Sequence, residues 1–385
     1  MAKSTHTSVS PLRAELETLA AFEPVDLPVV SLYLNLAADQ HGRDNFDQFV
    51  RKAFADRLRG LRSGSKERES FERDTARIRE YLERVDRAAN GLALFGCAGA
   101  NEFFQAIQLD APIDQHWLFI GAVPHLYPLA RLVDQHPRYA ALVLDTSSAR
   151  IFVFGLSSVQ HTREITNEKT RRSQAGGWSQ ARYQRRSDNM HLHHVKEVID
   201  TLDRVVTSEQ IPHIVVAGDE VAVPILKDQL PKHLAEKLVD VIKLERDAGE
   251  REVLEATLEV LRGKDATTDA ERVEELITQW RSGGLGVAGP EATLQALTLG
   301  QVDELLISGT PMVLKPVQRL PEGIAPAPVQ VDTSAPQSAI DPVRATLADE
   351  LVTRAEQTGA TIRFIEDGNL LAEIGGVGAL LRFRL

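Results

Sequence analysis

The stretch Tyr139-AALVLDTSSARIFVF-Gly155 decides the fold class of the middle of this chain. Two apolar runs flank the polar residues Asp145-Thr-Ser-Ser148, and Asp and Ser at such a place favour a tight turn. Apolar runs of this length, bounded by a turn, are typical of two paired strands. The stretch therefore predicts a β-hairpin that opens a domain.

Helices and strands alternate after this hairpin. In chain order we expect a helix from about Arg185 to Thr207, a strand over Ile211–Gly218, a helix near Val223–Leu230, a strand over Lys237–Leu244 and a helix over Asp247–Leu261. This alternation is typical of α/β domains. We predict an α/β domain over residues 137–265, with Lys264–Thr268 as a linker.

Two more domains are expected, because 385 residues exceed what one hydrophobic core usually holds. Residues 1–136 contain apolar strand candidates and, between Asp44 and Ala88, two charged segments with apolar residues at helical spacing. They predict an α+β domain that includes a helical hairpin. Residues 269–385 predict an α/β domain, in which the proline-rich segment 311–342 forms an irregular connection.

The composition excludes several classes of protein. The net charge of -11 argues against a protein that coats nucleic acid indiscriminately, but it permits one local basic contact. The single cysteine, Cys97, allows no intramolecular disulfide and no thiolate metal cluster, which favours a reducing cytoplasm. No apolar run approaches the ~20 residues that span a bilayer, so we expect no membrane insertion.

One segment reverses the sign of the charge. From residue 169 to residue 186 there is no Asp or Glu, and the basic residues are Lys169, Arg171, Arg172, Arg182, Arg185 and Arg186. Gly176 and Gly177 permit close backbone approach to another chain. Arg binds phosphate and stacks on bases, and Trp178 and Tyr183 add stacking faces, a mixture that suits folded RNA. The segment predicts an RNA contact.

Three other motifs have simpler interpretations. Gly284, Gly286 and Gly289 match a dinucleotide-binding spacing, but a predicted helix precedes them where that motif needs a strand, so we interpret them as a helix end and turn. His191–His194 holds three histidines without a ligand partner at a recognised spacing, so we expect no metal. Gly218-Asp219-Glu220 is interpreted as a tight turn before a helix.

The basic segment and the end of the chain resemble the archaeal and eukaryotic class I peptide-chain release factors. Arg182, Tyr183 and Arg185 fall on matching positions beside that family's Gly-Gly-Gln loop, and Gly375-Gly-Val-Gly-Ala-Leu-Leu-Arg-Phe383 is similar to its ending. The resemblance implies three domains: a decoding-centre domain, a middle α/β domain, and a C-terminal domain like the kink-turn-binding ribosomal proteins. It also implies a protein of the ribosomal A site.

Two departures from the family pattern bear on activity. Trp178 stands where the release factors carry the Gln that positions water, and Gln180 restores a Gln only with a Gly-x-x-Gln spacing. Residues 1–136 also lack Asn-Ile-Lys-Ser, the stop-codon-reading signature. The chain most resembles the bacterial relatives of this family, the Balon-type hibernation factors among them, which share the architecture without the full catalytic loop.

Two functions are carried forward from this resemblance. One is a ribosome ligand of hibernation or rescue, binding rRNA or tRNA through the basic segment. The other is a peptidyl-tRNA hydrolase acting through Gln180, with Gly176 and Gly177 as further candidate catalytic residues. The implied partners are the ribosome, peptidyl-tRNA and a translational GTPase such as elongation factor Tu, with no cofactor. A soluble enzyme unconnected with ribosomes is the third class considered.

Overall fold

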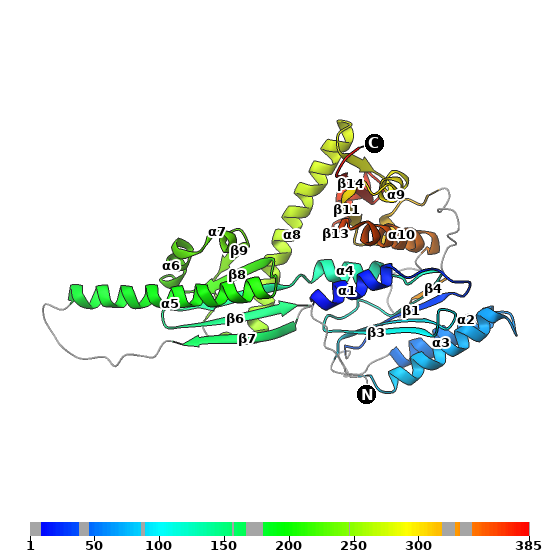
Figure 1. The fold of residues 1–385 in the computed structure, drawn as a ribbon, viewed down its shortest axis with the longest axis horizontal. Helices are drawn as coiled ribbons and strands as arrows, with labels where there is room; N and C mark the ends of the chain where they lie inside the picture. The colour runs from blue at the N-terminus through cyan, green and yellow to red at the C-terminus, as the bar shows by residue number, and fades with distance from the viewer. Residues whose placement is uncertain are drawn as a thin grey trace. The chain divides into compact units, whose positions relative to one another are not determined.

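The computed structural model describes residues 9–37, 46–85, 89–155, 158–166, 180–245, 247–317, 328–331 and 341–384 (Figure 1). Internal contacts divide the chain into two units. We call Pro137–Asp265 the middle unit, and Met1–His136 together with Ala266–Leu385 the terminal unit. Among the residues that the structure describes, every helix is too short or too polar to cross a lipid bilayer.

The middle unit is built on a five-stranded sheet in the order β7-β6-β5-β8-β9. Its strands are β5 (Tyr139–Leu144), β6 (Ser148–Gly155), β7 (Ser158–Thr166), β8 (His213–Gly218) and β9 (Leu238–Ile242). The predicted hairpin is confirmed, because β5 and β6 pair antiparallel in the register Leu144↔Ala149. Strands β5, β8 and β9 are parallel, which confirms the α/β class.

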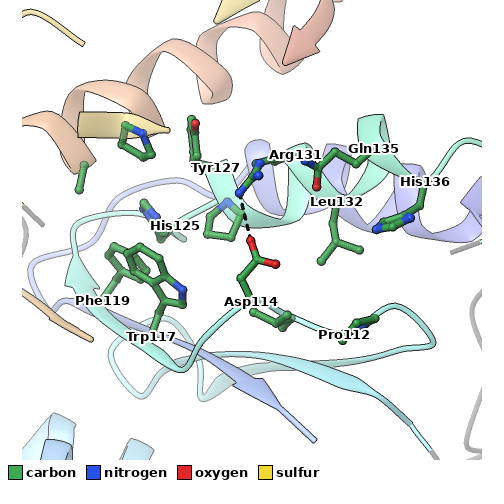
Figure 2. A pocket seen from close by; sticks show the side chains of 14 residues that line it. Pro112, Asp114, Trp117, Phe119, His125, Tyr127, Arg131, Leu132, Gln135 and His136 are labelled. Carbon is green, nitrogen blue, oxygen red and sulfur yellow. Dashed lines mark hydrogen bonds and ion pairs between the residues drawn. The ribbon is translucent and has the colours of Figure 1, made fainter. Parts of the chain in front are cut away.

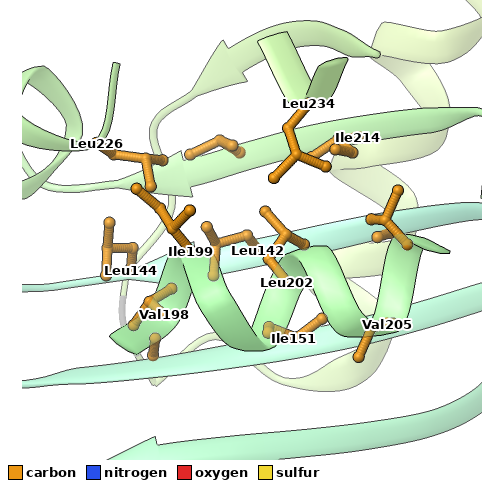
Figure 3. Close-up of a cluster of buried hydrophobic side chains, with 14 of the residues drawn as sticks. Leu142, Leu144, Ile151, Val198, Ile199, Leu202, Val205, Ile214, Leu226 and Leu234 are labelled. Atoms are coloured by element: carbon orange, nitrogen blue, oxygen red, sulfur yellow. The ribbon is translucent and has the colours of Figure 1, made fainter. Parts of the chain in front are cut away.

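Helices cover both faces of this sheet. Leu142 and Leu144 pack with Val198 and Leu202 of α5 (Gln180–Ser208), as Figure 3 shows, and with α6 (Ala222–Gln229) and α7 (Lys232–Ala235). Tyr139, Ala141 and Val143 alternate to the opposite face and pack with Val253 and Leu261 of α8 (Glu250–Arg281). Burial of both faces explains the continuous apolar run from which the sequence analysis began.

Helix α8 corrects two predictions made from the sequence. The helix predicted over 247–261, the linker predicted over Lys264–Thr268 and the helix predicted before the glycine motif are one continuous helix. The linker contains no proline, and its Ala and Thr residues continue a helix at well under 1 kcal/mol each. Buried residues at both ends, Leu261 and Val273 among them, stabilise the helix across this stretch.

The first part of the terminal unit is an antiparallel sheet in the order β12-β4-β1-β2-β3. It consists of β1 (Val29–Asn35), β2 (Gly91–Cys97), β3 (Phe103–Leu109), β4 (Trp117–Gly121) and β12 (Val329–Val331). The predicted helical hairpin is confirmed as α2 (Phe46–Gly60) and α3 (Lys66–Leu82). Its apolar residues, such as Phe54 and Phe71, pack with Leu32 and Leu94 on one face of the sheet.

A second sheet, in the order β10-β14-β11-β13, forms the rest of the terminal unit. Its elements are β10 (Gly286–Ala288), α9 (Pro290–Thr298), β11 (Val302–Ser308), the 3-10 turn η1 (Pro311–Val313), α10 (Pro342–Thr358), β13 (Thr361–Ile365), α11 (Gly368–Ala372) and β14 (Val377–Leu381). Strands β11 and β13 are parallel, and β14 runs antiparallel between β10 and β11. The predicted α/β class therefore holds here as well.

The glycine motif of this sheet is structural. Gly289 has φ of 86° and precedes Pro290, the first residue of α9, so this glycine lies in a turn, as predicted. Gly376 has φ of 84°, and a Cβ atom there would lie 2.9 Å from the carbonyl oxygen of Val313. A helix, α8, precedes the glycines, and β10 pairs with β14 instead of preceding a phosphate-binding turn.

The two sheets of the terminal unit are joined by contacts between distant residues. β12 pairs with β4 in the register Val329↔Phe119, although the proline-rich segment had been predicted to be irregular. Asp349 of α10 accepts hydrogen bonds from the amides of Leu126 (2.5 Å) and Tyr127 (3.2 Å), at the start of α4 (Tyr127–Gln135). Its second carboxylate oxygen lies 3.3 Å from Nδ1 of His125. Asp349 thus caps a helix far away in the sequence.

Replacement of Asp349 by Ala should destabilise the terminal unit. The change leaves two buried helix-terminal amides and His125 without this acceptor, so we expect a loss of about 2 to 3 kcal/mol. Urea unfolding followed by circular dichroism measures the loss. Asp303→Ala is the matched control, because Asp303 is exposed and its pair with Arg382 contributes at most about 1 kcal/mol. Equal losses in both variants would contradict the capping role.

The buried carboxyl of Asp74 makes the stability of the terminal unit depend on pH. Asp74 lies on α3, accepts a hydrogen bond from Ser70 at 3.4 Å, and is 4% exposed. Burial raises the pKa of Asp74 to about 6, although hydrogen bonds from Ala98 and Ser70 act in the opposite direction. The ordinary pKa of an unfolded Asp is about 3.9. The protonated carboxyl therefore stabilises the fold below that value, and the stabilisation is lost as the pH rises through about 6.

Asp74→Asn should remove this dependence, because the amide keeps an oxygen acceptor and does not ionise. Relative to the variant, the wild type should lose stability between pH 4 and pH 7, a window set by the pKa of about 6. Melting temperatures of both proteins across this range test the prediction. A difference between them that stays constant with pH would refute it.

Candidate nucleic-acid interface

The predicted RNA-binding segment connects β7 to α5 in the middle unit. β7 ends at Thr166 and α5 begins at Gln180, five residues earlier than the helix predicted from about Arg185. Residues Lys169, Arg171, Arg172, Gly176, Gly177 and Trp178 lie outside the described residues. The backbone of Gln180, Arg182, Tyr183, Arg185 and Arg186 forms the first two turns of α5, and their side chains lie outside the description.

Helix α5 extends well beyond the core that anchors it. Its first buried side chains among those described are His194 and Val195, and Met190 and His193 are exposed. The helix starts at Gln180, so about 20 Å of helix, at 1.5 Å per residue, precede the anchored part. Figure 1 shows α5 reaching past the ends of β6 and β7. The fold therefore holds the basic turns away from the sheet.

The beginning of α5 concentrates positive charge. Positions 182, 185 and 186 are separated by three and four residues and so share one helix face. The unpaired amides at a helix N-terminus add a partial positive charge of about half an elementary charge. No acidic residue occupies the first turn of α5, where one would normally stabilise the helix. Phosphate oxygens are the ligands that such an end favours.

The three histidines of α5 do not face one point. His193 is exposed, His191 is half-buried, and His194 is fully buried with neither ring nitrogen hydrogen-bonded among the described residues. No group of three metal-ligating side chains occurs in the part of the chain that the structure describes. His194 is best explained as a core residue of α5, next to Val195 and Val198.

The acidic residues at the ends of β5 and β8 serve as turn and capping residues. Oδ1 of Asp145 accepts hydrogen bonds from the amides of Ser147 (2.5 Å) and Ser148 (2.7 Å). Burial acts to raise the pKa of Asp145, but these hydrogen bonds outweigh it and hold the pKa below its ordinary value. Asp219 accepts from the amides of Val221 and Ala222 at 3.0 and 2.6 Å and caps α6. The turn predicted at Gly218-Asp219-Glu220 is confirmed.

A second basic surface, which the sequence analysis missed, lies on the terminal unit. The turn between α2 and α3 carries Arg57, Arg59, Arg62 and Lys66, with no Asp or Glu from residue 57 to residue 66. Arg59, Arg62 and Lys66 are exposed. Ser65 caps α3, and Nη1 of Arg68 donates to the carbonyl of Leu58 at 3.0 Å, which holds the turn in place. A search for stretches without Asp or Glu would find this run. It is not apparent in the overall charge of α2 and α3, because acidic residues lie on both sides of it.

Two family models match adjacent parts of the chain. The model described as "Bacterial archaeo-eukaryotic release factor family 10" matches residues 124–262, which contain the basic segment. The model described as "eRF1 domain 3" matches residues 266–385. The two matches meet inside α8, near the border between the middle and the terminal unit.

Curated relatives are similar over most of the chain. Peptide chain release factor subunit 1 of Thermococcus kodakarensis is 22% identical, over 97% of this chain and 97% of its own length. That of Methanobrevibacter smithii is also 22% identical, over 78% of this chain and 81% of its own. Among solved structures, ribosome-bound archaeal Pelota with ABCE1 matches 97% of this chain and 94% of its own at 15% identity, with a TM-score of 0.45. An archaeal translation termination factor, aRF1, covers 98% and 99% at 16% identity, with a TM-score of 0.28.

Neutralising the first turns of α5 should weaken RNA binding. The triple variant Arg182→Gln, Arg185→Gln, Arg186→Gln removes three charges, and each phosphate contact to single-stranded RNA contributes about 0.7 to the salt slope. We therefore expect the slope of log K against log salt to fall by up to about 2 units. Fluorescence anisotropy with labelled RNA at several salt concentrations measures this slope.

The matched control removes three exposed charges elsewhere on the middle unit. Lys227, Lys232 and Arg251 lie on α6, α7 and α8, and the side chains of Lys232 and Arg251 are 92% and 90% exposed. Their replacement by Gln should leave the salt slope nearly unchanged. If the two triple variants lose the same slope, binding follows net charge and the helix start has no special role.

Proposed function

We propose that this chain, a bacterial member of the release-factor and Pelota superfamily, is a ribosome-associated translation factor of hibernation or rescue. In this proposal it occupies the A site and contacts rRNA or tRNA with the segment 169–186. The observation that carries the proposal is the acid-free basic segment leading into a helix that begins about 20 Å before its buried anchor.

The proposed RNA-binding residues are those of the basic segment. They are Lys169, Arg171, Arg172, Trp178, Arg182, Tyr183, Arg185 and Arg186. From residue 169 to residue 186 the sequence contains no Asp or Glu, and phosphate is the counter-charge that we propose for these residues. Trp178 and Tyr183 would stack on bases that RNA loops expose.

The turn between α2 and α3 supports a second contact. Arg59, Arg62 and Lys66 are exposed on the terminal unit, and a turn of this kind binds phosphates irrespective of sequence. The absence of Asn-Ile-Lys-Ser from residues 1–136 fits a contact that does not read stop codons. We propose that this turn contributes affinity and no codon specificity. A translational GTPase such as elongation factor Tu is the protein partner that we propose from family membership.

Hydrolysis of peptidyl-tRNA is the alternative function. Gln180 is the first residue of α5, where the backbone amides of the helix end favour a developing negative charge. A neutral Gln is too weak a base to remove a proton from water, but it can orient a water molecule toward an ester carbonyl. Gly176 and Gly177 would allow the loop to approach the ester closely. We favour the binding role, because Trp178 takes the place of the expected Gln.

Release of labelled peptide from stalled ribosomes separates the two functions. For a binding factor, the wild type should sediment with ribosomes and release no peptide, and Trp178→Ala should weaken binding by about 1 to 3 kcal/mol, the value of one stacked base. For a hydrolase, the wild type should release peptide. Gln180→Ala should then abolish release while binding survives, since such a group is worth about 2.7 to 4 kcal/mol of barrier.

Gln184→Ala is the matched control, one helical turn after Gln180 on α5. Release by the wild type that Gln180→Ala abolishes and Gln184→Ala preserves would establish the hydrolase and overturn our preference. A protein that fails to sediment with vacant or with stalled ribosomes would refute the proposed function as a whole.

A further inference from the structure

The terminal unit contains a small pocket that the proposed function does not use. It lies between β4, the loop before this strand and α4, and its volume is about 90 Å³. Figure 2 shows Trp117 and Phe119 at one wall, Asp114 and Pro112 on the loop, and Arg131 reaching from α4 toward Asp114. Sites for drug-sized molecules enclose about 300 to 1,000 Å³, so this pocket has room for a small group only.

One wall of the pocket is a stack of aromatic rings. The rings of Trp117 and Phe119 are nearly parallel, at 9° with centroids 5.4 Å apart, and the ring of His125 lies 3.4 Å from Phe119 at 23°. Phe119 and His125 are buried, whereas Trp117 is half-buried. Trp117 is therefore the accessible end of the stack, and a further planar ring would extend it.

The opposite side of the pocket presents a donor beside an acceptor. Nη1 of Arg131 lies 3.3 Å from Oδ2 of Asp114, and the same guanidinium makes two hydrogen bonds to Glu366, at 3.1 and 2.8 Å. A guanidinium has five N–H groups, and these contacts use three of them among the described residues. The side chain of Asp114 is 78% exposed, so it keeps acceptor capacity at the mouth of the pocket.

The charges at the pocket argue against a phosphate ligand. Two carboxylates, Asp114 and Glu366, outnumber the single guanidinium of Arg131, so no net positive charge is left for a phosphate group. A neutral planar ring with adjacent donor and acceptor groups satisfies both walls, and the pairing edge of a nucleobase has this pattern.

We propose that this pocket binds a single-ring pyrimidine base, which stacks on Trp117 and places its pairing edge on Arg131 and Asp114. The base comes either from a free nucleoside or from an unstacked position of single-stranded RNA, and the two sources share this chemistry. A volume of about 90 Å³ is small for a ligand site, and for this reason we propose a single ring in place of the larger double ring of a purine. The site does not depend on the basic segment 169–186, and it stands or falls independently of ribosome binding.

Photochemical cross-linking with 4-thiouridine tests the proposal on the full-length protein. The neutral nucleoside is irradiated with the protein, and the labelled peptide is identified by mass spectrometry. We expect a saturable cross-link in the peptide that contains Trp117, displaced by uridine and cytidine and much less by adenosine. A cross-link only at Trp178 or Trp280, no saturation, or equal displacement by adenosine would overturn the proposal.

A second arm identifies the source of the base. A uridine decamer with one central 4-thiouridine is compared with the free nucleoside. A cross-link at Trp117 that saturates at much lower decamer concentration assigns the site to RNA, and equal concentrations assign it to a free nucleoside. A decamer that reacts only within residues 169–186, while the nucleoside does not react at Trp117, would reject the pocket and leave the proposed function intact.

Two substitutions complete the test. Trp117→Leu should weaken nucleoside binding about 5- to 150-fold, the effect of losing one stacked aromatic. Trp280→Leu removes another tryptophan of the terminal unit, 40% exposed and outside the pocket, and should leave binding unchanged. Unchanged binding by a folded Trp117→Leu protein would overturn the assignment. If Trp117→Leu does not fold, the cross-link map of the wild type decides alone.

Discussion

The terminal unit depends on one carboxylate that serves a helix more than two hundred residues away in the chain. Asp349 accepts the amides of Leu126 and Tyr127, which begin α4 and have no capping side chain of their own. Buried amides without a partner cost free energy comparable to a lost hydrogen bond. α4 therefore has a satisfied N-terminus only when α10 lies against it. The hydrogen bond from the hydroxyl of Tyr127 to the carbonyl of Ser308 reinforces the same junction.

In the middle unit, the basic start of α5 lies away from the hydrophobic core that anchors the later part of the helix. Six positive charges within eighteen residues repel one another and cannot be buried without partners. The fold anchors only the later part of α5, through Val198, Leu202 and their neighbours, against a sheet covered on both faces. Among the described residues, the stability of this helix comes from that apolar contact.

Much of the architecture follows from residue patterns, because burial imposes a period on the chain. The continuous apolar run Tyr139–Leu144 marks a strand buried on both faces between two helical layers, and the spacing of Phe46, Phe49 and Phe54 marks α2. β12 could not be predicted, since three residues in a proline-rich segment carry no period and become a strand only through pairing with β4. The cap from Asp349 is equally hidden, because its partner lies in another segment.

The basic sites differ in what the sequence reveals. The charge of segment 169–186 is visible in any window, whereas the run at Arg57–Lys66 is diluted by acidic residues on both sides. The start of α5 at Gln180 was missed, because the residues that follow Gly176 and Gly177 were interpreted as part of a loop up to about Arg185. The ring stack from Trp117 to His125 could not be predicted from the sequence, because the chain must turn between β4 and α4 to place His125 on Phe119.

The position of β12 in the chain has a consequence for biosynthesis. β4 is complete once residue 121 has been made, but its pairing partner, Val329–Val331, follows about 210 residues later. At a synthesis rate of roughly 5 to 20 residues per second, β12 is made about 10 to 40 seconds after β4. During that interval the nascent chain exposes one unpaired edge of β4, which carries Trp117 and Phe119, and such an edge can pair with other chains. The speed of elongation between these two points sets how long a growing chain is open to misassembly or to shielding by a chaperone.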